Sequence, residues 1–443
     1  MDKISVFSLL FYWDLMFTFE TQILMKTVPK IDRLAGIECY CTDFREIGGS
    51  IKKDNEGFRV SEIINESILV GLSPVQDNLH KYPLYLLEKK GIDSHHALVE
   101  IRKDLGLDLR IMGMKDAKAI TKQYASSMRI GNAHQQQLCK TKHTFLELKG
   151  FTTRPIGKES LLGNEFSITI YDAKHFEMSE FKKEVEKVAN FYGLQRFGSE
   201  RLVTHLVGRE IVKRNFKKAA ELLLSYTTEY DSAMSKEIRQ KSLDPKNYRN
   251  ILKQLPKGMD IEYQLMNAFV NGKEPISALR SISINIRRLF VHAYQAYIFN
   301  RCLSNAIANG ENLLRSSEND LCFEVEGPLT FGRIRKFNSA TEQETRLTPA
   351  LRLAGYSFQS GKGRFELITK KIMDEENVTP RDFYIKEMQE LSNQGGFRQA
   401  LLCCRDFTYL SSSGITFKLP KGSYATTLLR EIMKPEDPVK AGF

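Results

Sequence analysis

The sequence predicts an α+β protein with more than one domain, and three observations support this prediction. The chain has 443 residues, too many for one ordinary hydrophobic core, so two domains or one heavily inserted domain are expected. Short alternating runs typical of strands fill roughly the first 200 residues, without a repeated strand–helix–strand rhythm. Long helical patterns then dominate, and strand patterns return after Gly395-Gly396. The strand-rich parts are therefore expected to form a mixed, mostly antiparallel sheet.

The first strand-rich part contains short elements separated by clear turn signals. Alternating runs between Ile37 and Ile63 are broken by Gly48-Gly49, a pattern of strands and turns. One helix is expected from Ser94, as its cap, to Leu105. The other predicted elements are strands at 107–112, 123–130, 143–151 and 166–171, and a helix at 179–190 with Phe181, Val185, Val188 and Ala189 on one face.

The second part is expected to be helix-rich. Helical periodicity covers 203–228 and 283–308, and it resumes at 380–392. Gly361-Lys362-Gly363-Arg364 predicts a basic, glycine-rich loop between them. A strand from Ile415 to Leu419 follows, and then a last helix with Ser423 as its cap, Met433 near its end and Pro435 as its stop.

The composition favours a polyanionic partner. The net charge is +11 and the isoelectric point is about 9.1, with the excess spread along the chain, which favours a folded basic surface over a basic tail. The seven cysteines are odd in number and lack a C-x-x-C pair, so reduced thiols in the cytoplasm are expected. The sequence contains neither H-E-x-x-H nor a phosphate-binding loop. We therefore expect no metal, and the short apolar run at 4–13 predicts no membrane span.

One acidic residue on a short loop is the strongest functional signal. Asp116 lies between Lys115 and Lys118 in the segment 113–123, and alone this would be a solvated turn. Two further segments accompany it, Asn-Phe-Tyr-Gly-Leu-Gln-Arg-Phe-Gly at 190–198 and Phe-Lys-Leu-Pro-Lys-Gly-Ser-Tyr-Ala-Thr at 417–426. In this order the three segments resemble the TruD family of RNA pseudouridine synthases. Gly163-Asn164-x-Phe166 and residues 293–300 resemble the same family.

The resemblance implies a domain organisation. It covers nearly everything from Met25 to Met433 and implies a pseudouridine synthase core interrupted by an inserted, helix-rich α/β TRUD domain. The catalytic domain is then expected at 25–204 and 397–443, with the insertion at 205–396. Residues 1–24 precede the resemblance. They are interpreted as an extension from a misassigned start codon, or as a genuine amphipathic appendage.

The resemblance also implies which residues form the site. Asp116 is expected to be the catalytic residue, and Lys52 is expected to be its electrostatic partner. A nearby cation favours the ionised form of a carboxylate. The residues expected to hold the flipped base are Phe58, Asn190, Tyr192 and Tyr424, by stacking and by hydrogen bonds to the base edge. Lys115 and Lys118 are expected to contact phosphates or solvent. Before Phe58 the family usually has Pro-Glu-Asp, where this chain has Asn-Glu-Gly.

The functional hypothesis is an isomerase that converts uridine to pseudouridine in tRNA, where the family's usual target is uridine 13. The reaction changes no oxidation state and hydrolyses no bond overall, so neither cofactor nor metal is required. The partner is tRNA, and basic segments at 209–218 and 361–364 are candidates for its surface. The alternatives are a non-catalytic RNA-binding protein on the same scaffold, and a hydrolase that pairs Asp116 with Glu56. The oligomeric state stays open.

Overall fold

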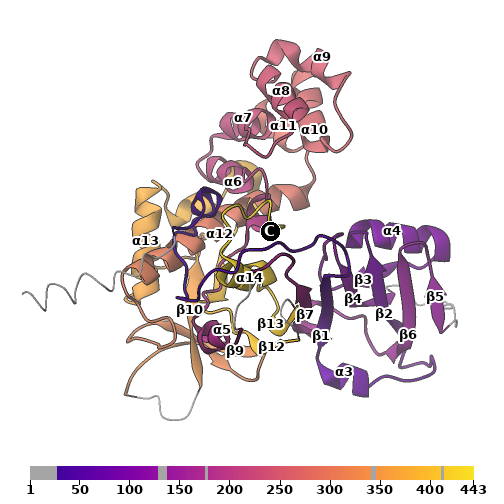
Figure 1. The fold of residues 1–443 in the computed structure, drawn as a ribbon. Coiled ribbons are helices and arrows are strands. Elements are labelled where there is room, and N and C mark those ends of the chain that lie inside the picture. The colour runs from indigo at the N-terminus through magenta and orange to yellow at the C-terminus, as the bar shows by residue number, and fades with distance from the viewer. Residues whose placement is uncertain (1–26, 128–136, 175–177, 341–345, 411–413) are drawn as a thin grey trace, which may run out of the picture.

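The computed structural model describes residues 27–127, 137–174, 178–340, 346–410 and 414–443. Within these ranges the fold is α+β, with a nine-stranded sheet, a four-stranded sheet and a large set of helices (Figure 1). The proposed extension at 1–24 and the end of the strand expected at 123–130 lie outside the described residues. None of the helices in these ranges is long and apolar enough to cross a lipid bilayer.

The elements follow one another in three stretches of chain. The strands are β1 (Phe58–Ile64), β2 (Tyr82–Lys90), β3 (Leu109–Ile111), β4 (Ile120–Ser127), β5 (Leu138–Lys140), β6 (Thr144–Thr152), β7 (Leu161–Thr169), β8 (Leu321–Val325), β9 (Phe331–Lys336), β10 (Leu347–Leu353), β11 (Gly396–Gln399), β12 (Arg405–Tyr409) and β13 (Gly414–Pro420). The α-helices are α2 (Lys30–Leu34), α3 (Glu66–Val70), α4 (Ser94–Leu105), α5 (Met178–Glu184), α6 (Thr204–Val212), α7 (Phe216–Ser225), α8 (Ala233–Lys241), α9 (Tyr248–Leu252), α10 (Asp260–Val270), α11 (Pro275–Leu279), α12 (Ile284–Ala308), α13 (Arg364–Glu375) and α14 (Ala425–Met433). Short 3-10 helices are η1 (Lys158–Ser160), η2 (Val185–Lys187), η3 (Leu194–Phe197), η4 (Pro245–Asn247), η5 (Pro380–Phe383) and η6 (Lys386–Leu391).

The large sheet joins the two ends of the described chain. Its strand order is β12-β13-β7-β1-β4-β2-β6-β5, with β3 paired to β4. Strands β1 and β4 are parallel and the other pairs are antiparallel, so the prediction of a mixed, mostly antiparallel sheet is confirmed. At the centre, Val60 pairs with Phe166 on β7 and with Thr121 on β4. This register brings three strands from distant parts of the sequence side by side.

A hydrophobic core packs the centre of the large sheet against the last helix. It includes Phe58, Phe166 and Phe417 on β1, β7 and β13, and the buried side chains of α14. The rings of Phe166 and Phe417 stack with their centroids 5.2 Å apart. Because these residues face one another across neighbouring strands, the sheet holds the start of α14 in a fixed place. The residues just before α14, Ser423 and Tyr424, are thereby positioned beside the sheet.

The helix-rich part is built around α12. The prediction of a helix at 283–308 is confirmed by α12, and α6 and α13 pack on it. The four-stranded sheet has the order β11-β10-β8-β9 and is antiparallel throughout. The helical segment expected at 203–228 is divided into two helices, because α6 ends at Val212 and α7 begins at Phe216. Arg214 adopts a left-handed backbone with φ of 65°, and its guanidinium donates to Tyr384 O over 2.7 Å, which fixes the break.

Other helix boundaries differ from the sequence expectations for local reasons. Asp93, not Ser94, caps α4, since its carboxylate accepts from the backbone N–H groups of His95 and His96. Ser423 makes no cap on α14, whose N-cap position is Tyr424. The helical stretch expected at 179–190 ends as the 3-10 turn η2, and 380–392 forms η5 and η6.

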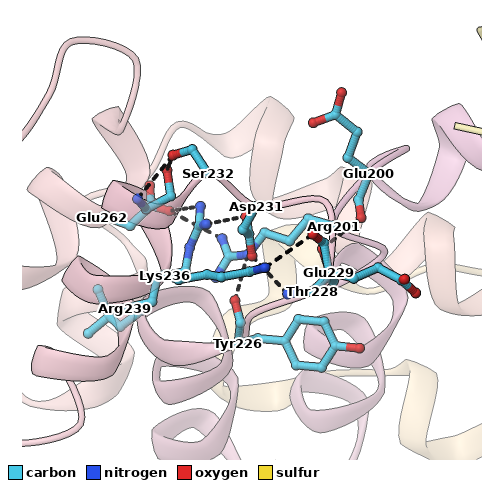
Figure 2. A network of polar contacts seen from close by, with 12 residues as sticks. Glu200, Arg201, Tyr226, Thr228, Glu229, Asp231, Ser232, Lys236, Arg239 and Glu262 are labelled. Carbon is cyan, nitrogen blue, oxygen red and sulfur yellow. Dashed lines mark hydrogen bonds and ion pairs between the residues drawn. The ribbon is translucent and has the colours of Figure 1, made fainter. Parts of the chain in front are cut away.

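Helices α7 to α11 form a cluster, here called the helical arm, that projects away from both sheets (Figure 1). Buried charges join it to the segment that follows η3 (Figure 2). Arg201 donates to Leu223 O on α7 over 2.7 Å and pairs with Glu262 on α10 at 3.2 Å. Arg239 on α8 pairs with the same carboxylate at 3.2 Å and with Asp231. Each of these four side chains therefore has an opposite charge beside it.

Candidate active site

A cavity of about 200 Å³ opens where the centre of the large sheet meets the start of α14. Strands β1, β4 and β7 form its floor, the loop between β3 and β4 forms one side, and the residues before α14 form another. The residues that line it are Phe58, Val60, Met114, Lys115, Asp116, Ala119, Thr121, Asn164, Phe166, Gln195, Ser423, Tyr424, Ala425 and Thr426. All three sequence segments that indicated function contribute to this one cavity.

Asp116 lies at the mouth of the cavity with its carboxylate half exposed. The side chain is 53% exposed, and its Oδ2 lies 3.2 Å from Lys52 Nζ. The same Oδ2 accepts a hydrogen bond of 3.0 Å from Gln195 Nε2. A carboxylate that is held through one oxygen and still faces open space can act on a ligand in the cavity.

Lys52 reaches Asp116 from a backbone conformation that is uncommon for this residue type. Its φ of 57° lies in the left-handed region, and its side chain is only 9% exposed. The preceding residue is fixed by a hydrogen bond of 2.8 Å from Ile51 N to Ala441 O. The ammonium lies 5.0 Å from the centroid of the Phe58 ring, which adds a cation–π contact. The surrounding contacts therefore hold an unfavourable local geometry that aims the cation at the carboxylate.

The loop that carries Asp116 is held from behind by buried polar groups. Lys89 is 1% exposed, and its ammonium donates to Asp116 O and to Ile92 O, each over 2.7 Å. Burial lowers the pKa of Lys89 to about 8. Ser94 accepts from Lys115 N over 2.9 Å and contacts Gln123 Oε1 at 3.1 Å. These contacts fix the loop's backbone, so the position of the Asp116 carboxylate depends on them.

Lys115 makes an internal ion pair that the sequence did not predict. Its ammonium lies 2.7 Å from Glu62 Oε1, and the two side chains are 11% and 0% exposed. The other oxygen of Glu62 accepts from Tyr124 N over 3.0 Å. The expectation that Lys115 contacts phosphates or solvent is therefore wrong, since a buried carboxylate on β1 engages it. Lys118 is exposed, as expected.

Aromatic rings border the cavity on two sides. Phe58 belongs to β1 and is buried, and its ring meets Phe166 edge-on at 6.5 Å. Tyr424 lies opposite, and its hydroxyl accepts a hydrogen bond of 3.1 Å from Arg196 Nε. Its ring meets that of Tyr192 at 6.0 Å. Phe58 and Tyr424 thus supply ring surfaces at the cavity itself.

The two other residues expected to hold the base form a layer behind this wall. Asn190 is 1% exposed, with its Oδ1 accepting from Arg398 over 2.7 Å and its Nδ2 donating to Gln399 O over 3.3 Å. The guanidinium of Arg398 lies 4.1 Å from the centroid of the Tyr192 ring and donates to Gly422 O over 2.7 Å. Neither Asn190 nor Tyr192 is among the described residues that line the cavity.

Sequence reasoning missed three residues that build this site. Gln195 belongs to the segment 190–198, in which the sequence indicated roles only for Asn190 and Tyr192. Lys89 and Arg398 have no sequence signal of their own, because basic residues are common in exposed positions of strands. Only the buried position of the two side chains distinguishes them from surface charges.

Two basic residues in the segments expected to face RNA are engaged inside the protein. Arg364 pairs with Glu311 at 2.9 Å and with Asp320 at 3.0 Å. Arg214 bonds to backbone carbonyls and pairs with Glu387 at 3.3 Å. Lys217 and Lys362 are exposed and have no ion pair within the described ranges. The expectation of free surface charge is therefore wrong for the two arginines.

Comparison with known proteins identifies the family. The family profile of tRNA pseudouridine synthase D (TruD) matches residues 34–432. The chain belongs to the TruD family. The match includes the Asp116 loop, the segment 190–198 and the whole of the segment 417–426.

Curated TruD relatives match along nearly their whole length. A protein of Methanococcoides burtonii named "Probable tRNA pseudouridine synthase D" is 30% identical, over 93% of this chain and 99% of the relative. Another of Methanosarcina acetivorans with the same name is 32% identical, over 92% and 97%. A crystal structure from Methanosarcina mazei that carries the TruD name superposes with a TM-score of 0.73 at 29% identity, covering 93% of this chain and 99% of that one.

Membership of the TruD family defines the class of activity. The chain is an RNA-modifying enzyme, an isomerase of the tRNA pseudouridine synthase class. Within the parts of the chain that the structure describes, no group of three His, Cys, Asp or Glu side chains is arranged to hold a metal ion.

Proposed function

We propose that this TruD enzyme isomerises one uridine of tRNA to pseudouridine, at position 13, and that Asp116 is the reacting group. The observation that carries the proposal is the half-exposed Asp116 carboxylate, held on one oxygen by Lys52 and Gln195 at the mouth of a small cavity. The position in tRNA rests on the family resemblance, and the role of Asp116 rests on the family loop together with this geometry.

The chemistry needs one carboxylate and no redox partner. The N1–C1′ bond of uridine breaks, the base turns, and a C5–C1′ bond forms. The proton on C5 leaves and N1 gains a proton, so the product has the same atoms as the substrate. Asp116 takes part as an ionised carboxylate, either as a nucleophile or as a base. The arrangement is compatible with attack on C6, attack on C1′ or a glycal route.

The size and lining of the cavity support a single flipped base as the ligand. Its volume of about 200 Å³ lies below the range of roughly 300–1,000 Å³ that is typical of drug-sized ligands. The rings of Phe58 and Tyr424 border it, and a flipped base is commonly held between such rings. We propose that these two residues contact the base directly. Asn190 and Tyr192 then shape the pocket from behind, through Arg398.

Lys52 is proposed to hold the Asp116 carboxylate in place while RNA binds. Its ammonium lies 3.2 Å from Oδ2, and this positive charge offsets the repulsion between the carboxylate and incoming phosphates. Because the Lys52 side chain is mostly buried, solvent screens this interaction less than it would at the surface. The ring of Phe58 closes one side of the ammonium and limits its movement.

The same proposal divides the chain into a catalytic domain and an insertion. Residues 25–204 and 397–443 form the catalytic domain, and 205–396 form the inserted TRUD domain. In support, β13 returns to pair with β7 in the large sheet after the helix-rich part. Strand β11 begins at Gly396 and pairs with β10, so the second boundary is better placed at about residue 400. The proposed RNA surface includes the lysines at the start of the helical arm.

The contacts of Glu56 argue against the alternative of a hydrolase. Glu56 pairs with Lys90 at 2.6 Å and with Arg59, and it is not among the described residues that line the cavity. A hydrolase with paired carboxylates would need both acids at one bond. The proposal therefore keeps a single reacting carboxylate.

Mapping pseudouridine in total RNA tests the proposed function. RNA from cells that lack the protein should lose the modification at tRNA position 13 and regain it when the parent protein is supplied. The purified protein should also introduce it into an unmodified tRNA transcript without releasing free uracil. Unchanged modification in the deletion, together with no activity on the transcript, would refute the proposal.

A further inference from the structure

The two protein donors that reach Asp116 share one of its two oxygens. Lys52 Nζ lies 3.2 Å from Oδ2, and Gln195 Nε2 donates to the same Oδ2 over 3.0 Å. Among the described residues, no hydrogen bond or ion pair reaches Oδ1. The carboxylate is therefore held asymmetrically, with one oxygen saturated by the protein and the other left to the cavity.

Gln195 comes from a rigid part of the fold rather than from a mobile loop. It lies on η3, between the buried side chains of Leu194 and Phe197. Gly193 lets this turn approach the first turn of α14 closely, because a Cβ there would lie 2.8 Å from Thr426 Oγ1. The backbone of Gln195 is thus held by its packed neighbours, while its amide faces the cavity and the Asp116 carboxylate.

We propose that Gln195 is a positioning residue that, together with Lys52, immobilises Oδ2 of Asp116 and so makes Oδ1 the oxygen that reacts with the uridine. This inference rests on the proposed function. It holds for each chemical route, because a nucleophile and a base both act through a lone pair on a carboxylate oxygen. Two donors from opposite elements, the Lys52 segment and η3, fix the rotation of the carboxylate about its terminal bond.

The Gln195 side chain is a neutral amide, so it can orient the Asp116 carboxylate without changing the charge of the site. Lys52 supplies the positive charge, and Gln195 adds a directional hydrogen bond without adding or removing charge. A hydrogen bond to a charged acceptor is stronger than one between neutral groups. A glutamate in this place would put a second negative charge beside Asp116 and disfavour its ionised form. An aliphatic residue would leave Lys52 as the only described protein group holding Oδ2.

Kinetics of Gln195→Leu and Gln195→Glu with a tRNA substrate test the inference. Gln195→Leu should lower kcat roughly 10- to 100-fold, as expected when one hydrogen bond to a charged group is removed. Its KM and thermal unfolding midpoint should stay close to the parent's, because the side chain is exposed. Gln195→Glu should move the acid limb of the pH–rate profile to higher pH. The matched control is Gln254→Leu, the same change at an exposed position that lies outside the cavity lining.

Three results would count against the inference. The first is a Gln195→Leu enzyme with the parent's kcat. The second is a Gln195→Leu enzyme in which only KM rises, which would make Gln195 a contact for RNA instead. These outcomes are separate from failure of the proposed function, in which the parent enzyme itself forms no pseudouridine. A lowered kcat in Gln195→Leu with an unshifted limb in Gln195→Glu would also count against it, because the amide would then not contact the reacting carboxylate.

Discussion

Two clusters of partly or fully buried charge in this molecule differ in one respect. In the helical arm, Arg201 and Arg239 surround Glu262, and Asp231 neutralises the second arginine (Figure 2). In the cavity, Lys52 pairs with Asp116, but the carboxylate remains half exposed and one of its oxygens has no partner among the described residues. In the arm each charged side chain lies beside an opposite charge inside the fold, whereas in the cavity the Asp116 carboxylate faces a space that a ligand can enter.

This difference distinguishes a charge network that stabilises the fold from one that contains the proposed reacting group. Burial lowers the pKa of Arg201 in the arm to about 10 and that of Lys89 behind the Asp116 loop to about 8. Perturbed groups therefore occur in both regions and do not by themselves identify the site. What identifies the site is a carboxylate that the protein holds through one oxygen and that stays half exposed at a cavity. Substitutions in the two regions should accordingly have different effects.

The largest effect is expected from Asp116→Asn. The amide keeps the shape of the side chain but cannot act as a nucleophile or base, so pseudouridine formation should fall by at least about 1,000-fold. Binding of tRNA should stay within a few-fold, because one exposed charge is removed at the cavity mouth. Nucleoside analysis of a tRNA transcript measures the first quantity and filter binding the second. Substantial turnover by this variant would remove Asp116 from the reaction.

Lys52→Ala should have the next largest effect, a fall in kcat of roughly 100-fold near neutral pH. Without the cation, Gln195 is the only described group that holds Oδ2 of Asp116, so the carboxylate is less well oriented toward the cavity. Lys53→Ala is the matched control, since its exposed ammonium pairs with Asp172 away from the cavity. An unchanged rate in Lys52→Ala would make Lys52 a structural residue only.

In the arm, Glu262→Gln should affect stability and not chemistry. It leaves two mostly buried guanidinium groups without their shared carboxylate, which should lower the free energy of unfolding of the arm by roughly 3 kcal/mol. The rate per folded molecule on a short oligonucleotide should match the parent's. Glu237→Gln is the control, because its pair with Lys241 lies on the surface. Chemical denaturation and single-turnover kinetics make the comparison, and a catalytic defect in Glu262→Gln would contradict it.

The smallest effect is expected from the lysines at the start of the arm. Lys213→Glu/Lys217→Glu should weaken tRNA binding several-fold and flatten its salt dependence by roughly one unit for each phosphate that the protein no longer neutralises. Lys362→Glu tests the second basic segment separately, without Arg364, whose ion pairs are internal. A short oligonucleotide that does not reach the arm should bind as before. Parent-like affinity and salt slope for tRNA would place the RNA surface elsewhere.

The sequence predicted much of this arrangement, and its failures have a common cause. The Asp116 loop and Lys52 were recognisable from the resemblance, although they are 64 positions apart and meet only in the folded chain. The role of Lys115 was mispredicted because its partner, Glu62, lies on a strand that no local pattern brings near the loop. The helix break at Arg214 depends on the carbonyl of Tyr384, 170 positions away. Contacts between distant segments thus decide details that periodicity leaves undetermined.

Asn190 illustrates the same limit at the pocket. Its amide was expected at the edge of the base, and an amide does suit that task. In the fold, Arg398 and Gln399 engage both ends of that amide. An arginine 208 positions away could not be foreseen as the neighbour of Asn190 from either local sequence.

The most direct test of the account compares three proteins in one assay, tritium release from tRNA labelled at C5 of uridine, normalised to folded protein. The exposed carboxylate at the cavity and the paired, buried charges in the arm lead to opposite predictions for their variants. The parent and Glu262→Gln should release tritium at the same rate, and Asp116→Asn should release none above background. Equal release by the parent and Asp116→Asn, or failure of folded Glu262→Gln to release tritium, would contradict the account.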